Sequence, residues 1–144
     1  MKIDEKTKKE VIDVMNRYAS ASEAKDVEGI MSLFPSDDNN IIIYGSGADE
    51  KRIGPEEIRA QMERDFSQAD SMALIYDWYS VEGTDNVAWF SADVTVSATV
   101  SGKKMTLPAR FTTVLEKRNG RWFMVQGHFS IPASGQSEGD SFPG

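Results

Sequence analysis

The feature that most restricts the fold is a predicted β-hairpin in residues 110–130, with the turn signal Asn119-Gly120 at its centre. Its first strand alternates Arg110, Thr112, Val114 and Glu116, and its second alternates Trp122, Met124, Gln126, His128 and Ser130. Polar and apolar side chains therefore share one face. An unpaired polar group in a core costs roughly 1–3 kcal/mol, so such a face is more typical of a pocket wall than of a packed core.

The two-residue alternation of side chains that marks this hairpin begins much earlier in the sequence, near Met72. Strand-like segments cover residues 72–81, 87–100, 104–117 and 121–131. Turn-forming residues separate them at 83–86, 101–102 and 119–120. This spacing predicts four consecutive antiparallel strands.

The N-terminal half has helical periodicity. One helix is expected from about Asp4 to Ala24, and Asp26 can cap a shorter one that ends near Phe34. After a short β-branched strand at 41–44, a third helix should start at Gly54-Pro55 and run to about Gln68. These elements predict an α+β fold: a curved antiparallel sheet, shaped like a cone and wrapped by about three N-terminal helices.

Length and composition limit the alternatives. A chain of 144 residues suits one domain, expected over residues 1–132, with an irregular tail over 133–144. The net charge of −7, without a basic stripe, argues against nucleic acid as a partner. No signal peptide or membrane span is evident, so we expect a cytoplasmic protein that has no membrane partner. Cysteine is absent, which excludes thiolate chemistry.

Several motifs, in their order and spacing, resemble a known superfamily. They are Arg17-Tyr18, the segment 25–34, Gly54-Pro-Glu-Glu-Ile58, the segment 110–114, Asn119-Gly-Arg-Trp122 and His128-Phe-Ser130. Together they resemble the SnoaL-like branch of the nuclear-transport-factor-2-like superfamily. They are also similar to ketosteroid isomerase and to the association domain of calcium/calmodulin-dependent protein kinase II. The resemblance implies a cone with a cavity, but this fold hosts both enzymes and non-catalytic binding domains.

His128 is the natural candidate for proton transfer, because an imidazole can act as acid or base near neutral pH. The resemblance places it beside the central cavity. The alternative is a core histidine with one hydrogen-bond partner. A single histidine cannot build a multi-histidine site, so no metal is expected.

Arg110 and Asp93 could complete such a site. On the resemblance, Arg110 takes the position of an oxyanion-hole acid, where a guanidinium would hold a carboxylate or enolate. Asp93 could orient His128 if its face of strand 87–100 is the inner one, but either face could be. The alternatives are an exposed Arg110, with or without Asp93 as its partner, and a solvated Asp93.

Tyr18 matches a helix-one tyrosine that, in ketosteroid isomerase, donates a hydrogen bond to the substrate oxygen. It could equally be a core residue with its hydroxyl at the rim. Trp89 matches a position that lines the cavity in that enzyme. Where the isomerase has its carboxylate base, this chain has Ile41-Ile42-Ile43-Tyr44, so steroid isomerisation by that mechanism is not expected.

The strand 72–79 carries aromatic residues on both predicted faces. If both faces are covered, the helices of the chain cover one and a second copy covers the other, because sheets of this superfamily commonly pair across a two-fold axis. The alternative is ordinary surface tyrosines. We therefore expect a homodimer formed through the sheet.

These residues predict an apolar cavity that binds a small organic compound with a carbonyl or carboxylate group. Its lining would be Tyr18, Trp89, Asp93, Arg110 and His128, with Tyr44 and Ser130 near the edge. An enzyme of this design would move a proton next to the carbonyl, as isomerases, cyclases, dehydratases and some hydrolases do. No cofactor is implied. The alternative is a non-catalytic ligand-binding or assembly module of the same fold.

Overall fold

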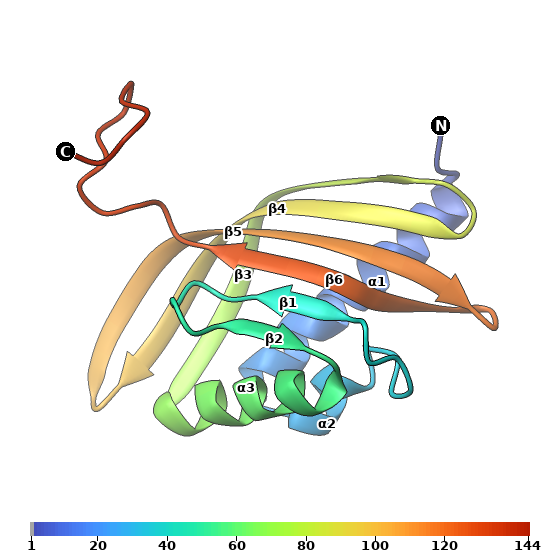
Figure 1. Ribbon diagram of the computed structural model, residues 1–144, viewed down its shortest axis with the longest axis horizontal. Helices are drawn as coiled ribbons and strands as arrows, with labels where there is room; N and C mark the ends of the chain where they lie inside the picture. The colour runs from blue at the N-terminus through green and yellow to red at the C-terminus, as the bar shows by residue number, and fades with distance from the viewer. Residues whose placement is uncertain (1) are drawn as a thin grey trace.

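The computed structural model describes residues 2–144 and has an α+β architecture with three helices and one six-stranded sheet (Figure 1). The helices are α1 (Glu5–Glu23), α2 (Val27–Met31) and α3 (Pro55–Gln68). The strands are β1 (Ile42–Tyr44), β2 (Lys51–Ile53), β3 (Ser71–Gly83), β4 (Val87–Val100), β5 (Lys103–Arg118) and β6 (Arg121–Ser130). The predicted fold class is confirmed.

The helices begin where the capping signals predict. Asp4 caps α1 by accepting a hydrogen bond from the Thr7 amide (2.7 Å). Asp26 caps α2 in the same way, through the amide of Gly29 (3.0 Å). Helix α2 ends at Met31, earlier than the predicted Phe34, because the next residues turn toward the sheet and the Leu33 carbonyl accepts from the Met124 amide (2.8 Å).

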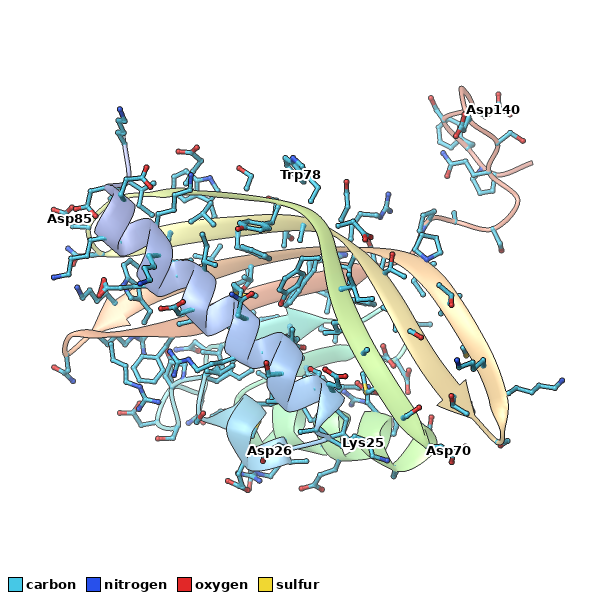
Figure 2. All side chains as sticks on the ribbon, turned by 180° about the vertical axis from the view of Figure 1, so that it is seen from behind. Lys25, Asp26, Asp70, Trp78, Asp85 and Asp140 are labelled. Atoms are coloured by element: carbon cyan, nitrogen blue, oxygen red, sulfur yellow. The ribbon has the colours of Figure 1, made fainter. Side chains whose placement is uncertain are left out.

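Helix α3 is fixed at both ends. Pro55 occupies its first turn, and the Glu57 carboxylate accepts a hydrogen bond from the Ile53 amide (3.0 Å). At the other end, Lys25 reaches from the α1–α2 connection and its Nζ donates to the Ala69 carbonyl (2.7 Å). Figure 2 shows Lys25 and Asp70 at this end of the molecule. The polar side chains of α3 are therefore held at a defined position over the sheet.

The sheet has the order β2-β1-β6-β5-β4-β3, with only β1 and β6 parallel. Strands β3 to β6 form the predicted antiparallel meander. The register places Asp93 opposite Arg110, and Thr112 opposite His128. Strand β2 was not predicted; it has only three residues and is ordered by pairing with β1.

The helices cover one face of the curved sheet, which we call the concave face, and leave the other, convex face uncovered (Figure 1). The core lies between helices and sheet, and β4 supplies Ala88, Phe90, Ala92 and Val94 to it. Across residues 2–144 no helix is long and apolar enough to span a membrane. Residues 131–144 contain no helix or strand, and Figure 1 shows this tail leading away from the sheet.

A β-bulge in β3 corrects one detail of the sequence analysis. The pairing with β4 shifts between Tyr76 and Trp78, so these two side chains do not share a face as alternation predicted. Tyr76 and Tyr79 both lie near Phe90 on the concave side, with ring centroids 5.3 and 5.8 Å away. Trp78 points away from the body of the molecule and is 55% exposed (Figure 2).

Candidate functional site

A cavity of about 310 Å³ lies between the concave face and the helices α1 and α3. This volume is at the lower end of the range for small-molecule sites. Its apolar wall comes from every layer around it: Phe34, Ile43, Met62, Phe66, Met72, Leu74, Val96, Leu107, Phe111, Met124, Phe129 and Ile131. The cavity therefore suits a compound with an apolar body.

The polar end of the cavity is built on α3, where Gln61, Asp65 and Gln68 lie at helical spacing on one side. Gln61 is buried, and its Nε2 donates to Asp65 Oδ1 (2.7 Å) and to Glu50 Oε2 (3.2 Å). Its Oε1 accepts from Arg52 Nε (2.8 Å). Because arginine can only donate, the amide orientation of Gln61 is fixed and its NH2 group must face the two carboxylates.

The pKa of the Asp65 carboxyl is perturbed by this environment. Burial raises the pKa of its carboxyl above the ordinary value, and the negative charge of Glu50 raises it further. The hydrogen bond from Gln61 and the charges of Arg64 and Arg52 lower the pKa but do not cancel the rise. Within residues 2–144, Asp65 Oδ2 has no hydrogen-bond donor, so one carboxylate oxygen remains available to a ligand.

Tyr18 brings a hydroxyl from α1 to the same cavity. Its ring packs against Phe111, with the centroids 5.2 Å apart. Burial raises the pKa of Tyr18, and the charge of Asp65 adds to the rise. The hydroxyl thus stays protonated, and among residues 2–144 it makes no hydrogen bond, so it can donate one to a ligand.

The loop between β1 and β2 closes the cavity near Glu50. The Glu50 side chain accepts from the Gly47 amide (3.0 Å) and from Arg64 (2.5 Å). A Cβ atom at Gly45 would come within 2.2 Å of Glu50 Oε1, so a larger residue there would displace the Glu50 carboxylate. The carboxylate of Glu50 is therefore well supplied with donors, in contrast to that of Asp65.

The residues predicted for the site are divided between the two faces of the sheet. Tyr18 lines the cavity as expected. Trp89, Asp93 and Arg110 belong to the opposite alternation from the buried Phe90, Ala92 and Phe111, so their side chains lie on the convex face. That placement differs from the expected one, because the inner face of β4 is the apolar one. These three residues do not meet Tyr18.

The remaining predicted residues lie on the neighbouring strands β1 and β6. The ring centroids of Tyr44 and His128 are 5.4 Å apart, and both residues border the cavity through the β1–β6 pair. His128 is exposed and pairs with the exposed Thr112 on the convex side. Ser130 accepts a hydrogen bond from Arg110 Nε (3.2 Å). Arg110 and Asp93 face each other in register yet form no ion pair within residues 2–144.

The convex face carries a second, shallower hollow of about 270 Å³. Its lining includes Trp89, Ser91, Thr112, Val114, Gln126 and His128. Of the predicted site residues this hollow includes Trp89 and His128. The expected alternation along β6 is wrong in one respect: Trp122 and Met124 are buried, whereas Gln126 and His128 are exposed, because the pairing with β5 shifts between Val114 and Leu115. Among residues 2–144 no three His, Asp or Glu side chains converge to hold a metal ion.

Sequence reasoning missed Asp65, Gln61 and Glu50. The available signal was the polar row Gln61, Asp65 and Gln68 beside the apolar row Ile58, Met62 and Phe66 on the same helix. Such a row is usually solvated. Here the β1–β2 loop and the curved sheet enclose it.

Comparisons with known proteins agree with this architecture. Residues 11–134 match the model of the SnoaL-like domain family, and the chain belongs to that family. A nuclear-transport-factor-2-like superfamily protein from Salmonella enterica has a TM-score of 0.82 at 20% identity, covering 94% of this chain and 96% of its own. A proposed dehydratase of that superfamily from Streptomyces avermitilis has a TM-score of 0.82 at 14% identity, covering 91% and 100%.

A more distant neighbour is a characterised kind of enzyme. A type 2 hexachlorocyclohexane dehydrochlorinase has a TM-score of 0.77 at 11% identity, covering 89% of this chain and 86% of its own. At these identities the likeness concerns the fold alone. No curated protein matches the chain. The family and its neighbours are compatible with an enzymatic role and leave the reaction open.

Proposed function

We propose that the protein is a cavity enzyme that binds a small carbonyl compound and moves a proton on the carbon beside the carbonyl. In this proposal Asp65 is the base and Tyr18 donates a hydrogen bond to the carbonyl oxygen. The observation that carries it is the pairing of a free carboxylate oxygen with a free hydroxyl in one apolar cavity.

The chemistry follows from the environment of the two groups. A carboxylate whose pKa is raised is a stronger base than an ordinary one, and it can return the proton it has taken. Asp65 would take a proton from the α-carbon, and the C–H electron pair would move into an enolate. Tyr18 would stabilise the enolate oxygen by its hydrogen bond. If the compound has a β,γ C=C bond, the enolate is conjugated with it, and return of the proton to the γ-carbon would move the double bond to the α,β position and complete an isomerisation.

Tyr18 keeps the role that the sequence predicted for it. The predicted roles of Asp93 and Arg110 need these side chains inside the cavity, but both lie on the convex face. His128 borders the cavity but is exposed on the convex side, and this position favours Asp65 as the base. The prediction that the ligand carries a carboxylate depended on Arg110, which is exposed on the convex face. We therefore keep only the prediction that the ligand carries a carbonyl group.

The proposal is tested by deuterium exchange at the methyl group of 2-acetylnaphthalene in D2O, followed by mass spectrometry. Asp65→Asn is expected to reduce the enzyme-dependent rate by about 100-fold or more, within the range for removal of a general base. Tyr18→Phe should reduce it roughly tenfold or more by removing the donor. Glu63→Gln, an exposed carboxylate on the same helix, is the matched control and should leave the rate unchanged.

His128→Ala distinguishes the two assignments of the base. If it abolishes exchange and Asp65→Asn does not, the assignment to Asp65 is wrong and His128 is the base. If the probe binds without any exchange, the alternative of a non-catalytic ligand-binding module is supported.

The cytoplasm remains the proposed compartment, which cell fractionation would test.

We also propose that two copies pair through the convex face. The support is the exposed apolar side chains Ile75, Trp78 and Trp89, which no helix within residues 2–144 covers, together with Asp93 and Arg110 on the adjacent strands β4 and β5, which form no ion pair with each other. A two-fold axis near this pair would set Asp93 of one copy against Arg110 of the other. Sedimentation should then give about twice the 16.0 kDa of one chain.

Charge exchange tests this pairing. Asp93→Arg and Arg110→Asp should each weaken the dimer by placing like charges together, and the double variant should restore it. A 16.0 kDa species for the wild type at micromolar concentration would contradict the dimer.

A further inference from the structure

The wall of the cavity contains carboxylates but no lysine or arginine within residues 2–144. Its ionisable lining residues are Tyr18, Tyr44, Glu50, Asp65 and His128. Two of these five are carboxylates, and both lie at the polar end. The rest of the wall is mainly apolar, which strengthens any charge interaction inside it.

The nearest arginines are turned away from the cavity and engaged. Arg64 bonds to Asp49 (2.7 Å) and to Glu50 (2.5 Å). Arg52 donates to Gln61 and does not reach either cavity carboxylate. Each positive charge therefore supports a residue of the site and is not presented to a ligand.

The side-chain donors of the lining are the neutral groups of Tyr18, Ser22, Tyr44, Ser46, Gln61 and Gln68, together with the imidazole of His128. Gln61 donates from one Nε2 to both Asp65 and Glu50, so its amide hydrogens are occupied. The Ser22 hydroxyl donates to the Tyr18 carbonyl (2.8 Å). The Tyr18 hydroxyl is neutral and free. Apart from His128, which is exposed on the convex side, a ligand carboxylate would meet two carboxylates and neutral donors, and no lysine or arginine of the wall would replace its lost hydration.

From this arrangement we infer the substrate class: the cavity takes uncharged carbonyl compounds and rejects carboxylates of the same size and shape. The inference rests on the proposed function for the carbonyl group alone. What it adds is the charge of the substrate, because Asp65 and Glu50 disfavour a negatively charged compound. The carbonyl oxygen accepts from Tyr18, and the apolar wall holds the hydrocarbon.

The experiment compares matched probes that differ in charge. The probes are 2-acetylnaphthalene with a carboxamide or a carboxylate at position 6, and a one-ring pair, 4-acetylbenzamide and 4-acetylbenzoate. Binding is measured by calorimetry at pH 7. The wild type is expected to bind at least one carboxamide roughly 30-fold or more tightly than its carboxylate partner, because the second charge is desolvated beside Asp65.

Variants assign the selection to the cavity. Asp65→Asn should reduce the carboxamide-to-carboxylate ratio to a few-fold, and Glu50→Gln should reduce it in part. Glu63→Gln removes the same charge from an exposed site on the same helix and should leave the ratio unchanged. An equal fall in Glu63→Gln would mean that overall charge, and not the cavity, discriminates.

The outcomes separate this inference from the proposed reaction. Carboxamide binding at the expected ratio, without deuterium exchange, would overturn the reaction and support the charge selection. Deuterium exchange, together with equal binding of the carboxamide and the carboxylate, would support the reaction and overturn the charge selection. Absence of binding by either carboxamide, or a ratio near one in the wild type, overturns the inference.

Discussion

The two faces of the sheet use the same strands for different purposes. On the concave face, Phe90, Phe111 and Leu115 pack against the helices and are almost completely buried. On the convex face, their neighbours Trp89 and Thr112 are exposed. Every long strand thus contributes one row to the core and one row to the surface.

The comparison shows that clustering of polar side chains does not by itself locate a cavity. The convex face gathers Asp93, Arg110, Gln126 and His128, and no helix covers them (Figure 1). The concave face is apolar along the strands and receives its polar groups from α1 and α3. The chemistry of the enclosed side therefore comes from helices, and the strands supply its wall.

The largest expected difference between the faces is in stability. Phe90→Ala should lower the free energy of unfolding by about 3–5 kcal/mol, because it empties a fully buried site between Tyr76 and Tyr79. Trp89→Ala, one residue earlier, should cost under about 1 kcal/mol in the monomer. Urea unfolding at low protein concentration measures both. Equal losses would mean that the convex face is covered as well.

A smaller difference is expected for two adjacent threonines of β5. Thr113 is buried and its Oγ1 donates to the Gln126 carbonyl (2.6 Å), whereas Thr112 is exposed. Thr113→Val should therefore cost about 1 kcal/mol through the lost hydrogen bond. Thr112→Val keeps the same change of shape on the outer face and should stay within about 0.5 kcal/mol of wild type. Thermal unfolding of the two variants measures both losses, and a larger loss for Thr112→Val than for Thr113→Val would contradict this expectation.

Much of the fold could be predicted because its signals are local. Asn119-Gly120 fixes a hairpin turn, and Asp4 and Asp26 cap the helices that follow them. Strand β2 escaped prediction because Lys51, Arg52 and Ile53 carry no alternation that three residues could reveal, and only pairing with β1 makes them a strand. The bulge at Asp77 escaped for a similar reason, since it changes parity without a glycine.

The site was harder to predict, for a physical reason. Alternation says which residues share a face, but not which face the helices cover. The apolar row of Ala88, Phe90, Ala92 and Val94 was the better indication of the inner face. Asp65 lies on a helix rich in charged residues, where a carboxylate is ordinarily solvated. Its enclosure depends on contacts with a loop that precedes α3 in the sequence.

The third comparison is between the carboxylates of Asp65, on the concave side, and Asp93, on the convex side. Asp65→Asn is expected to raise the free energy of unfolding at pH 7 by somewhat under 1 kcal/mol, because functional groups held in an apolar cavity are often destabilising. Asp93→Asn, on the exposed side, should change it by less than about 0.5 kcal/mol. Chemical denaturation at pH 7 gives both values.

The pH dependence has a definite sign. The folded pKa of Asp65 lies above its ordinary value of 3.8, so the folded state binds more protons between the two pKa values. The stability of wild type relative to Asp65→Asn should therefore fall as the pH rises through that interval and stay constant above it. Glu50, Tyr18, Arg52 and Arg64 face the same carboxyl and remain in both proteins. A difference that grows with pH in favour of wild type would contradict the burial of Asp65.

The smallest expected effect is at His128. Its side chain is exposed and its ring lies near that of Tyr44 on the neighbouring strand β1, so His128→Ala should remain within about 0.5 kcal/mol of wild type. Trp122, at the other end of β6, is a core residue that is 5% exposed, and Trp122→Ala should cost roughly 3–5 kcal/mol. Thermal unfolding of the two variants should separate them clearly. If His128→Ala were as destabilising as Trp122→Ala, His128 would be a structural residue, and the division of β6 into a packed and an exposed row would fail at its C-terminal end.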